Sequence, residues 1–555
     1  MTSPFAHPWL ESFTAILPLP RSKDEWLIVD ISNSIREKPQ WKSQYKDESI
    51  ASQWKQEIKD CYSDKTQLID EIIDYVFAEL EWYDNVESEY PGLKEKGFTI
   101  ACDDKIVFSD TAIDPDLKLR LSSELKNLQS SFGDKPDYHP HTGNKVVDLI
   151  HPSLFPLEYS ATPTYADAKK SVVQLHEYSD EIHKVKKWVG KYGTSHKFQW
   201  LPSLLRINHE TDTFEFKSYI NNLHPTKYAS LYKDIQAVFN AVVPGLNFCL
   251  SRYASKPYFR IDIPPFEEAY EEEFQEKFKE FIDSDEPWKG EKFWELMNSK
   301  VNYLKSFHPK YVEGPDTNKT IDLVQDFHRL KVIVKASNIE LTPDNPRYEG
   351  GKWHVDGTIN EDIVASVMYY YDVENVTESN LKFKACFGDP KYEQGDDTYP
   401  REIYGVKDGD VMTRELGSIT AHEGRIVISP NCFQHQVAPF ELKNKSKPGH
   451  RKLLCFYLVD PYNHVVVTTD QVPPQQKAWW DDNELKKNLA DSLRKKILDL
   501  KPDEEFPVSW ERAQEVREEL MKDRNKDLDE FDEDPAFTRK FSFWNYDSSA
   551  EETAE

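Results

Sequence analysis

The chain has 555 residues, enough for several domains or for one large enzyme domain with additions. Hydrophobic residues make up 38% and aromatic residues 13%, which excludes a wholly disordered protein. The net charge is −28, from 98 acidic and 70 basic side chains, so the chain repels phosphate backbones and we expect no nucleic-acid binding. No apolar run could cross a bilayer and the first residues lack a secretory signal, so we expect no membrane association.

The cysteines point to a reducing compartment. There are 6 of them, spread from Cys61 to Cys455, and no two are separated by only two residues. Such spacing does not indicate a zinc knuckle or a disulfide framework. We therefore expect reduced, mostly buried thiols in a cytoplasmic or nuclear protein.

The first part of the chain, residues 1–324, is predicted to be mainly helical and to pack on the core. Apolar side chains recur at helical spacing after Ile69 and again after Leu231. A third stripe, beginning at Phe266, lies on a strongly acidic segment. For this stripe we expect an amphipathic helix packed on the protein's own core, in preference to a partner-binding helix.

The pattern changes to short strands over residues 325–475. Runs such as VIVKASNIEL and LLCFYLVD are rich in β-branched and aromatic residues, and turns with Pro and Gly separate them. They predict an α+β protein whose core is a double-stranded β-helix, of the jelly-roll or cupin-like kind. Helical spacing returns in residues 476–526, and we expect the acidic tail at 527–555 to be flexible.

The candidate site begins with a His-x-Asp pair, His354 and Asp356. Alternate residues of a strand point to the same face, so this imidazole and this carboxylate could hold one metal ion. A third candidate ligand, His435, ends the segment RIVISPNCFQH, which is predicted as a strand and a turn. Two histidines and one carboxylate suit non-haem Fe(II) and leave positions open for a substrate and O₂.

Arg451 lies further on, inside an apolar predicted strand. A buried guanidinium needs an anionic partner, and its planar fork fits a carboxylate. The open metal positions and this arginine together suggest a dicarboxylate co-substrate, with one end on iron and the other on Arg451.

These residues resemble the Fe(II)/2-oxoglutarate-dependent dioxygenases, whose fold is a double-stranded β-helix. More specifically, the chain resembles a mostly fungal family catalogued as domain of unknown function 4246. The resemblance runs in order through blocks such as HPSLFPLEY, GGKWHVDGTINEDIVAS and PGHRKLLCFYLVDP, and spans most of residues 150–480. Many members of that family carry Glu where this chain has Asp356, and either carboxylate can bind iron.

The resemblance implies a role for each matching residue. His354, Asp356 and His435 would bind iron, and Arg451 would bind the distal carboxylate of 2-oxoglutarate. No further catalytic residue is singled out.

In similar enzymes a tyrosine on the strand after the His-x-Asp turn also contacts the distal carboxylate. The candidates are Tyr369, Tyr370 and Tyr371. Strand parity favours either Tyr370 alone or the other two together, and we favour Tyr370. Asn338, on the preceding strand, either points toward the co-substrate or makes a strand-end hydrogen bond.

Three other histidines are alternatives. His422 is rejected as the distal ligand because no suitable arginine follows it at the expected spacing, apart from the one already placed after His435. His139 and His141 lie in a polar loop without a third ligand, so we expect both at the surface.

We therefore expect an oxidoreductase that uses Fe(II), 2-oxoglutarate and O₂. It would hydroxylate an unidentified small molecule or protein and release succinate and CO₂, and the carboxylate at Asp356 argues against halogenation. A second hypothesis is a non-catalytic metal-binding jelly-roll that serves as a scaffold for protein partners. A third is a cupin-like oxygenase that does not use 2-oxoglutarate.

Overall fold

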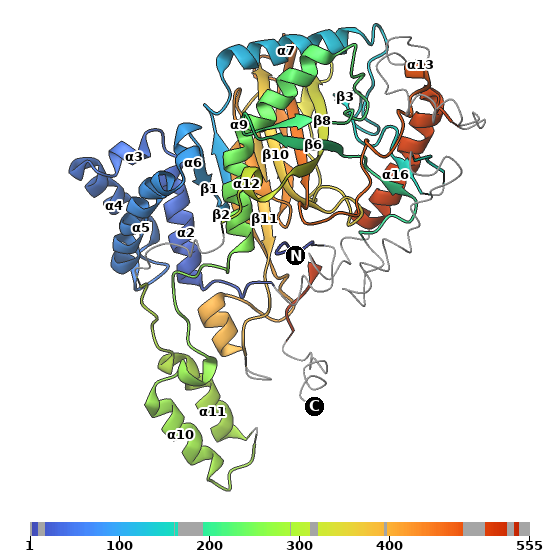
Figure 1. Cartoon of the computed structure of the whole chain (residues 1–555). Helices are drawn as coiled ribbons and strands as arrows, with labels where there is room; N and C mark the ends of the chain where they lie inside the picture. Colours follow the sequence, from blue (N-terminus) through green and yellow to red (C-terminus); the bar gives the residue numbers. More distant parts are fainter. Residues whose placement is uncertain are drawn as a thin grey trace.

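A nine-stranded antiparallel sheet lies at the centre of the computed structural model, with helices against one face and along two sides (Figure 1). The structure describes residues 3–8, 17–159, 161–164, 193–288, 290–310, 320–392, 397–480, 506–529 and 538–542. Part of the segment predicted as C-terminal helices, residues 481–505, and most of the acidic tail lie outside these residues. No described helix is both long and apolar enough to span a membrane.

The N-terminal helices form a bundle beside the sheet. The apolar stripe that starts at Ile69 is buried along the longest of them, as its spacing predicted. The side chain of Ser22 caps the first helix by accepting from the main-chain N–H of Glu25 at 3.1 Å. The helices are α2 (Lys23–Arg36), α3 (Trp41–Gln44), α4 (Glu48–Tyr62), α5 (Ile69–Glu89) and α6 (Pro91–Glu95).

The central sheet has the strand order β1-β2-β13-β10-β16-β8-β6-β7, and β3 pairs with the second half of β8. Every pairing between its described strands is antiparallel. Its strands are β1 (Thr99–Ala101), β2 (Asp103–Ser109), β3 (Val146–Ile150), β6 (Ser203–Asn208), β7 (Thr213–Phe216), β8 (Arg329–Leu341), β10 (Ile363–Glu374), β13 (Ile426–Pro430) and β16 (Gly449–Val459).

Five of these strands come from residues 1–324, where the sequence predicted mainly helices. The reason is their length and burial. Five of the seven residues of β2, for example, are buried, without alternation, and β3 is almost wholly buried. A short strand covered on both faces lacks the period of two by which strands are recognised.

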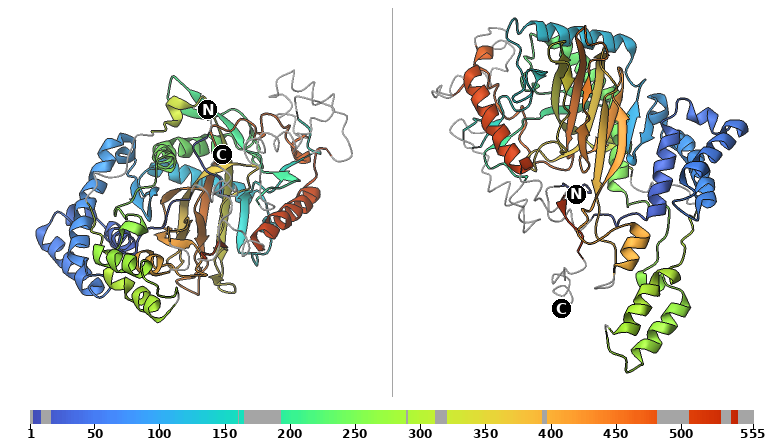
Figure 2. Two further views of the ribbon diagram at one scale, coloured as in Figure 1. Left: turned by 90° about the horizontal axis from the view of Figure 1, so that it is seen from below. Right: turned by 180° about the vertical axis from the view of Figure 1, so that it is seen from behind.

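Helices α7 (Pro115–Ser130) and α9 (Ala229–Ala254) cover one face of the sheet (Figures 1 and 2). The apolar stripe predicted after Leu231 is buried along α9 and packs on strand residues of the same core. On the other side of the molecule from the helical bundle lies α16 (Trp510–Asp529).

A second, three-stranded sheet faces the central one. Its order is β12 (Thr413–Thr420), β11 (Asn380–Cys386) and β14 (Gln434–Val437). Leu381 and Phe383 of β11 share an apolar cluster with Met368 and Tyr370 of β10. Mixed helices and antiparallel sheets confirm the broad class. Main-chain pairing does not close the described strands into a barrel, so the double-stranded β-helix stays a prediction.

The remaining elements are short or peripheral. Phe274, on the acidic stripe, is buried against Tyr270 and Tyr399 in a small apolar cluster separate from the main core, so the helix is packed within the chain but not on the central core that was expected. This helix, α10, and α11 form a hairpin that projects from the body (Figure 1). The elements are α10 (Glu272–Ile282), α11 (Glu291–Ser299), α12 (Leu323–Asp326), α13 (Lys477–Trp480), η1 (Phe266–Glu268), η2 (Lys300–Tyr303), η3 (Pro400–Tyr404), β4 (Leu157–Glu158), β5 (Phe198–Gln199), β9 (Arg347–Tyr348) and β15 (Phe440–Glu441).

Candidate metal centre and its cavity

The structure brings His354, Asp356 and His435 together. One donor atom from each lies within 4.8 Å of the others, so the three could hold a metal ion. His354 and His435 pair across an antiparallel bridge, in which each main-chain N–H donates to the other's carbonyl at 3.1 and 2.9 Å. Their ring centroids are 4.4 Å apart. We refer to these three residues as cluster one.

Asn431 fixes the turn that carries Asp356. Its side-chain oxygen accepts from the main-chain N–H of Asp356 at 2.8 Å, and its amide donates to the carbonyls of Asp356 and Ile363 at 2.8 and 3.0 Å. Gly357 follows with φ of +70°, and a Cβ there would come within 2.7 Å of Ile363. Glycine is therefore required for the chain to turn back into β10.

The protonation states in cluster one suit a metal ligand set. The Nδ1–H of His354 donates to the carbonyl of Lys352 at 2.9 Å, so in the neutral tautomer Nε2 is the nitrogen that can bind a metal. Burial lowers the pKa of His435 to about 4, although the Asp356 carboxylate opposes the shift, so this imidazole is neutral near pH 7. Metals bind neutral imidazole and ionised carboxylate.

The neighbours of Asp356 are neutral hydrogen-bond donors. Ser366 donates its hydroxyl to Oδ2 at 2.6 Å. Among the described residues, the ring of His435, with Nε2 at 3.7 Å from Oδ2, is the only basic group within ion-pair distance. Burial raises the pKa of the adjacent Tyr457 well above its usual value, and the charge of Asp356 adds to this shift. A metal ion could therefore approach the Asp356 carboxylate without displacing a lysine or arginine side chain.

A cavity of about 220 Å³ opens beside His354 and Asp356. Lys335 and Tyr457 line it from the central sheet, and Trp200 and Arg524 line another side. The Trp200 and Tyr457 rings stack with centroids 6.0 Å apart, and the Arg524 guanidinium lies 3.9 Å from the Trp200 ring centroid. The cavity is thus lined both by two of the candidate metal ligands and by aromatic side chains.

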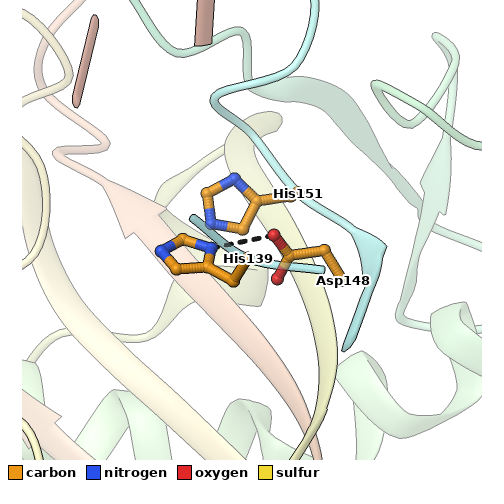
Figure 3. A group of neighbouring side chains, drawn as sticks. All are labelled: His139, Asp148 and His151. Carbon is orange, nitrogen blue, oxygen red and sulfur yellow. Dashed lines mark hydrogen bonds and ion pairs between the residues drawn. The ribbon is translucent and has the colours of Figure 1, made fainter. Parts of the chain in front are cut away.

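A second group of the same residue types is His139, Asp148 and His151, of which the two histidines line this cavity (Figure 3). One donor atom from each again lies within 4.8 Å of the others, so this group too could hold a metal ion. The sequence predicted His139 as a surface residue without a third ligand. That prediction is wrong, because β3 brings Asp148 beside it and His151 follows directly. We refer to these residues as cluster two.

The surroundings of cluster two differ. His139 donates Nδ1–H to Oδ2 of Asp148 at 2.8 Å, and the guanidinium of Arg517 lies 3.6 Å from the same oxygen. Arg517 also donates two hydrogen bonds of 2.9 Å to Asp137. The other oxygen of Asp148 has no hydrogen bond among the described residues. The carboxylate is already engaged by a donor and a cation.

The pKa shifts in cluster two follow from burial and close packing. Burial alone would raise the pKa of Asp148, but His151 and the hydrogen-bonded His139 lower it to about 2. Burial also lowers the pKa of His151 well below its usual value, although the Asp148 carboxylate opposes this. The main-chain N–H of Ser153 donates to Nδ1 of His151 at 3.2 Å, which places the imidazole proton on Nε2.

Arg451 does not line the cavity. It is 1% exposed, its guanidinium lies 5.1 and 5.3 Å from the ring centroids of Tyr370 and Phe440, and it donates to the hydroxyl of Ser379. On β16 it stands six residues before Tyr457, which corresponds to about 20 Å of strand rise. Arg451 is therefore buried in the interior of the protein, further along β16 from the cavity.

The strand parity of the three tyrosines is settled by their neighbours. Tyr370 faces the second sheet and Arg451, and burial raises its pKa to about 12 while Arg451 opposes the rise. Tyr369 and Tyr371 belong to the core under the helices. Of the two alternatives, the first holds, with Tyr370 alone on the inner face.

Asn338 points away from cluster one. Its amide donates to the side-chain oxygen of Gln129 on α7 at 2.9 Å, and its own oxygen accepts from the Tyr371 hydroxyl at 2.9 Å. The expectation that Asn338 faces the co-substrate is therefore corrected. Even-numbered residues in this part of β8 face the helices, whereas Lys335 faces the cavity.

Two rejected histidines lie apart from both clusters. His422 pairs with Asp110, with Nε2 and Oδ1 3.4 Å apart. His141 is exposed, and its Nε2 lies 3.6 Å from Oε2 of Glu518. Of the two histidines predicted to lie at the surface, only His141 is exposed.

The sequence matches family models over most of its length. A model described as a protein of unknown function (DUF4246) matches residues 70–483, and the model of the DUF4246 N-terminal domain matches residues 1–57. The chain belongs to the DUF4246 family. No curated protein matches it.

Three solved structures are similar to parts of this DUF4246 member, each at low identity. The Fe(II)/α-ketoglutarate-dependent dioxygenase TqaL is 10% identical, with a TM-score of 0.23 over 62% of this chain and 90% of its own. AviO1 from Streptomyces viridochromogenes is 10% identical, with a TM-score of 0.20 over 66% and 91%. IDO from Bacillus thuringiensis is 13% identical, with a TM-score of 0.15 over 24% and 46%. This chain thus spans less than half of IDO. At such TM-scores the matches do not establish a shared fold.

Sequence reasoning missed several residues at or near the cavity in this DUF4246 chain. Asp148, His151 and Lys335 were not singled out, although all three lie close to it. His151 begins the block HPSLFPLEY, one of those that carried the family resemblance, and this was the available signal. Lys335 gave no signal, because one lysine in an apolar strand indicates nothing until its neighbours are known.

Proposed function

We propose that this protein is a non-haem Fe(II) oxygenase that uses 2-oxoglutarate as its co-substrate. The observation that carries the proposal is the convergence of His354, Asp356 and His435, with donor atoms within 4.8 Å of one another, at the edge of a cavity. Two imidazoles and one carboxylate leave coordination positions free, which is the requirement for binding a co-substrate and O₂.

The donor set fits iron in its surroundings as well as its composition. The neutral donors Ser366 and Tyr457 and the absence of an ion-paired lysine or arginine leave Asp356 free to balance a divalent charge. This last point holds for the residues that the structure describes. The double-stranded β-helix is part of the same proposal, with the two facing sheets as its walls.

When bound, Fe(II) and 2-oxoglutarate would activate O₂ and oxidise a C–H bond of the substrate, with release of succinate and CO₂. The protein's own residues orient the reactants. The carbonyl of Lys352 holds the His354 ring with Nε2 toward the centre, and Asn431 and Ser366 fix the Asp356 carboxylate. The stacked Trp200 and Tyr457 rings exclude water from one side of the cavity.

The proposal is tested with the full chain, made metal-free and loaded with Fe(II) without oxygen. Addition of 2-oxoglutarate is expected to give a metal-to-ligand charge-transfer absorption band, and admission of air is expected to give succinate even without the prime substrate. His354→Ala is expected to lose both signals, whereas His422→Ala, which lies elsewhere, keeps them. A wild-type chain that binds Fe(II) but gives neither signal refutes the proposed co-substrate.

The placement of Arg451 favours a second candidate, an Fe(II) oxygenase of cupin-like type that does not use 2-oxoglutarate. This arginine was the expected anchor, and it lies between two aromatic rings without lining the cavity. Under this candidate, O₂ consumption with a suitable substrate would proceed without 2-oxoglutarate, and Arg451→Lys would leave the rate unchanged.

A further inference from the structure

The cavity beside cluster one has a cationic side chain of its own. Lys335 on β8 is half-buried and lines the cavity. Its ammonium makes no hydrogen bond or ion pair with the residues that the structure describes, and the Asp148 carboxylate interacts with its charge only from beyond ion-pair distance. A partly desolvated ammonium with no anion in direct contact is unfavourable, so this position favours an anionic ligand.

The strand register places Lys335 close to the metal ligands. Lys335 pairs with Cys455 on β16, two residues before Tyr457. Tyr457 pairs with Ser366 on β10, whose hydroxyl donates to Asp356. Along the strand direction, Lys335 therefore lies two residues, or about 7 Å, from the position at which Ser366 contacts Asp356. Arg451 is six residues from the same position, about 20 Å.

The other charged groups around the cavity are already paired. Arg524 donates to Glu361 at 2.7 Å. Asp148, behind His139 and His151, is held by His139 and Arg517. Asp356 faces the candidate metal position. Among the charged side chains that the structure places around this cavity, Lys335 is therefore the cation that an incoming carboxylate can neutralise.

We propose that Lys335, and not Arg451, anchors the distal carboxylate of a 2-oxo dicarboxylic acid whose oxo-acid end faces His354 and Asp356. The inference rests on the proposed function, because it takes 2-oxoglutarate as the molecule that spans the two positions. The lysine supplies a charge-assisted hydrogen bond, and Tyr457 lies on the same face of the sheet, with its hydroxyl at Asp356.

The test measures binding by titration calorimetry on the full chain, loaded with Mn(II) as a redox-inert substitute and kept without oxygen. Two ligands are compared: 2-oxoglutarate, and 2-oxobutyrate, which has the same oxo-acid end but no distal carboxylate. Lys335→Met is expected to weaken 2-oxoglutarate binding by about 10- to 100-fold and to leave 2-oxobutyrate binding unchanged. Lys335→Arg, which keeps the charge, is expected to retain most of the affinity for 2-oxoglutarate.

Lys452→Met is the matched control. It removes a lysine from β16 whose ammonium is paired with Asp372 at 2.6 Å, away from the cavity, and both affinities are expected to stay at the wild-type level. Thermal unfolding of each variant shows whether it has folded. Mn(II) affinity, measured in the same samples, shows whether the metal centre is intact.

Three results would overturn the inference. These are a Lys335→Met variant that binds 2-oxoglutarate as tightly as the wild type, loss of that affinity in Arg451→Lys alone, or a wild type that binds both ligands equally. Failure of the proposed function looks different, because the wild-type chain would then bind Mn(II) but neither 2-oxo acid. The two failures therefore give different binding results.

Discussion

Clusters one and two consist of the same residue types and border the same cavity, but the protein surrounds their carboxylates differently. Asp356 in cluster one receives a hydroxyl hydrogen bond and has a neutral imidazole 3.7 Å away. Asp148 in cluster two receives the Nδ1–H of His139 and has the Arg517 guanidinium 3.6 Å away. The negative charge of Asp356 is thus available to a divalent cation, whereas the charge of Asp148 is already partly balanced by Arg517.

This difference shows that donor atoms alone do not define a metal centre. Two imidazoles and a carboxylate can equally form a hydrogen-bonded network in which the carboxylate orients a histidine. The groups that already occupy the carboxylate decide between the two outcomes. We therefore expect cluster one to bind the metal and cluster two to stay a hydrogen-bonded network on the opposite wall.

The sharpest way to break the comparison is to remove one histidine from each cluster. His435→Ala is expected to abolish Fe(II) or Co(II) binding, because two ligands remain, whereas His151→Ala is expected to bind one metal ion per chain, as the wild type does. Metal content after dialysis and Co(II) absorption titration measure both. Two ions per wild-type chain, with one lost in His151→Ala, would show that cluster two is a metal site as well.

Arg517→Met tests whether cluster two depends on its cation. The change leaves two buried carboxylates, Asp137 and Asp148, without their shared partner, and is expected to lower the free energy of unfolding by about 3–5 kcal/mol. Denaturant unfolding measures the loss. Arg512→Met, an exposed arginine on the same helix, is the control and is expected to cost less than about 1 kcal/mol. Equal effects of the two variants would contradict the role given to Arg517.

Ser366→Ala sharpens the account of cluster one. It removes the hydroxyl that donates to Asp356 at 2.6 Å, and we expect metal affinity to fall by about 10- to 100-fold without loss of the fold. Competition with a chelator of known affinity gives the value. Ser337→Ala, which changes a buried serine on β8, serves for comparison, and an undiminished affinity in Ser366→Ala would argue against an orienting role.

The smallest effect is expected for Asn338→Ala. Its side chain bonds to Gln129 and Tyr371 under α7, so the change is expected to cost about 1 kcal/mol of stability and to leave 2-oxoglutarate affinity within twofold of wild type. Denaturant unfolding and calorimetry measure the two quantities. A large loss of affinity would mean that this residue acts on the cavity through β8.

The sequence predicted the meeting of His354, Asp356 and His435, because a His-x-Asp pair and a later histidine after a strand form a recognisable pattern. The position of Asn338 could not be predicted in the same way, since a one-residue change in strand parity turns a side chain to the opposite face. Cluster two escaped prediction because β3 has only five residues and little alternation. The position of Lys335 near the metal ligands could not be predicted either, because it depends on the register of three strands.

The bridge between His354 and His435 has a consequence for how the centre is assembled. The two residues come from distant segments, yet each peptide N–H is bonded to the other's carbonyl. The distance between the two residues is therefore set by this pair of main-chain hydrogen bonds and does not depend on a bound metal ion. Loading therefore requires little ordering of the backbone, and a chain stripped by a chelator is expected to take up its ion again without refolding.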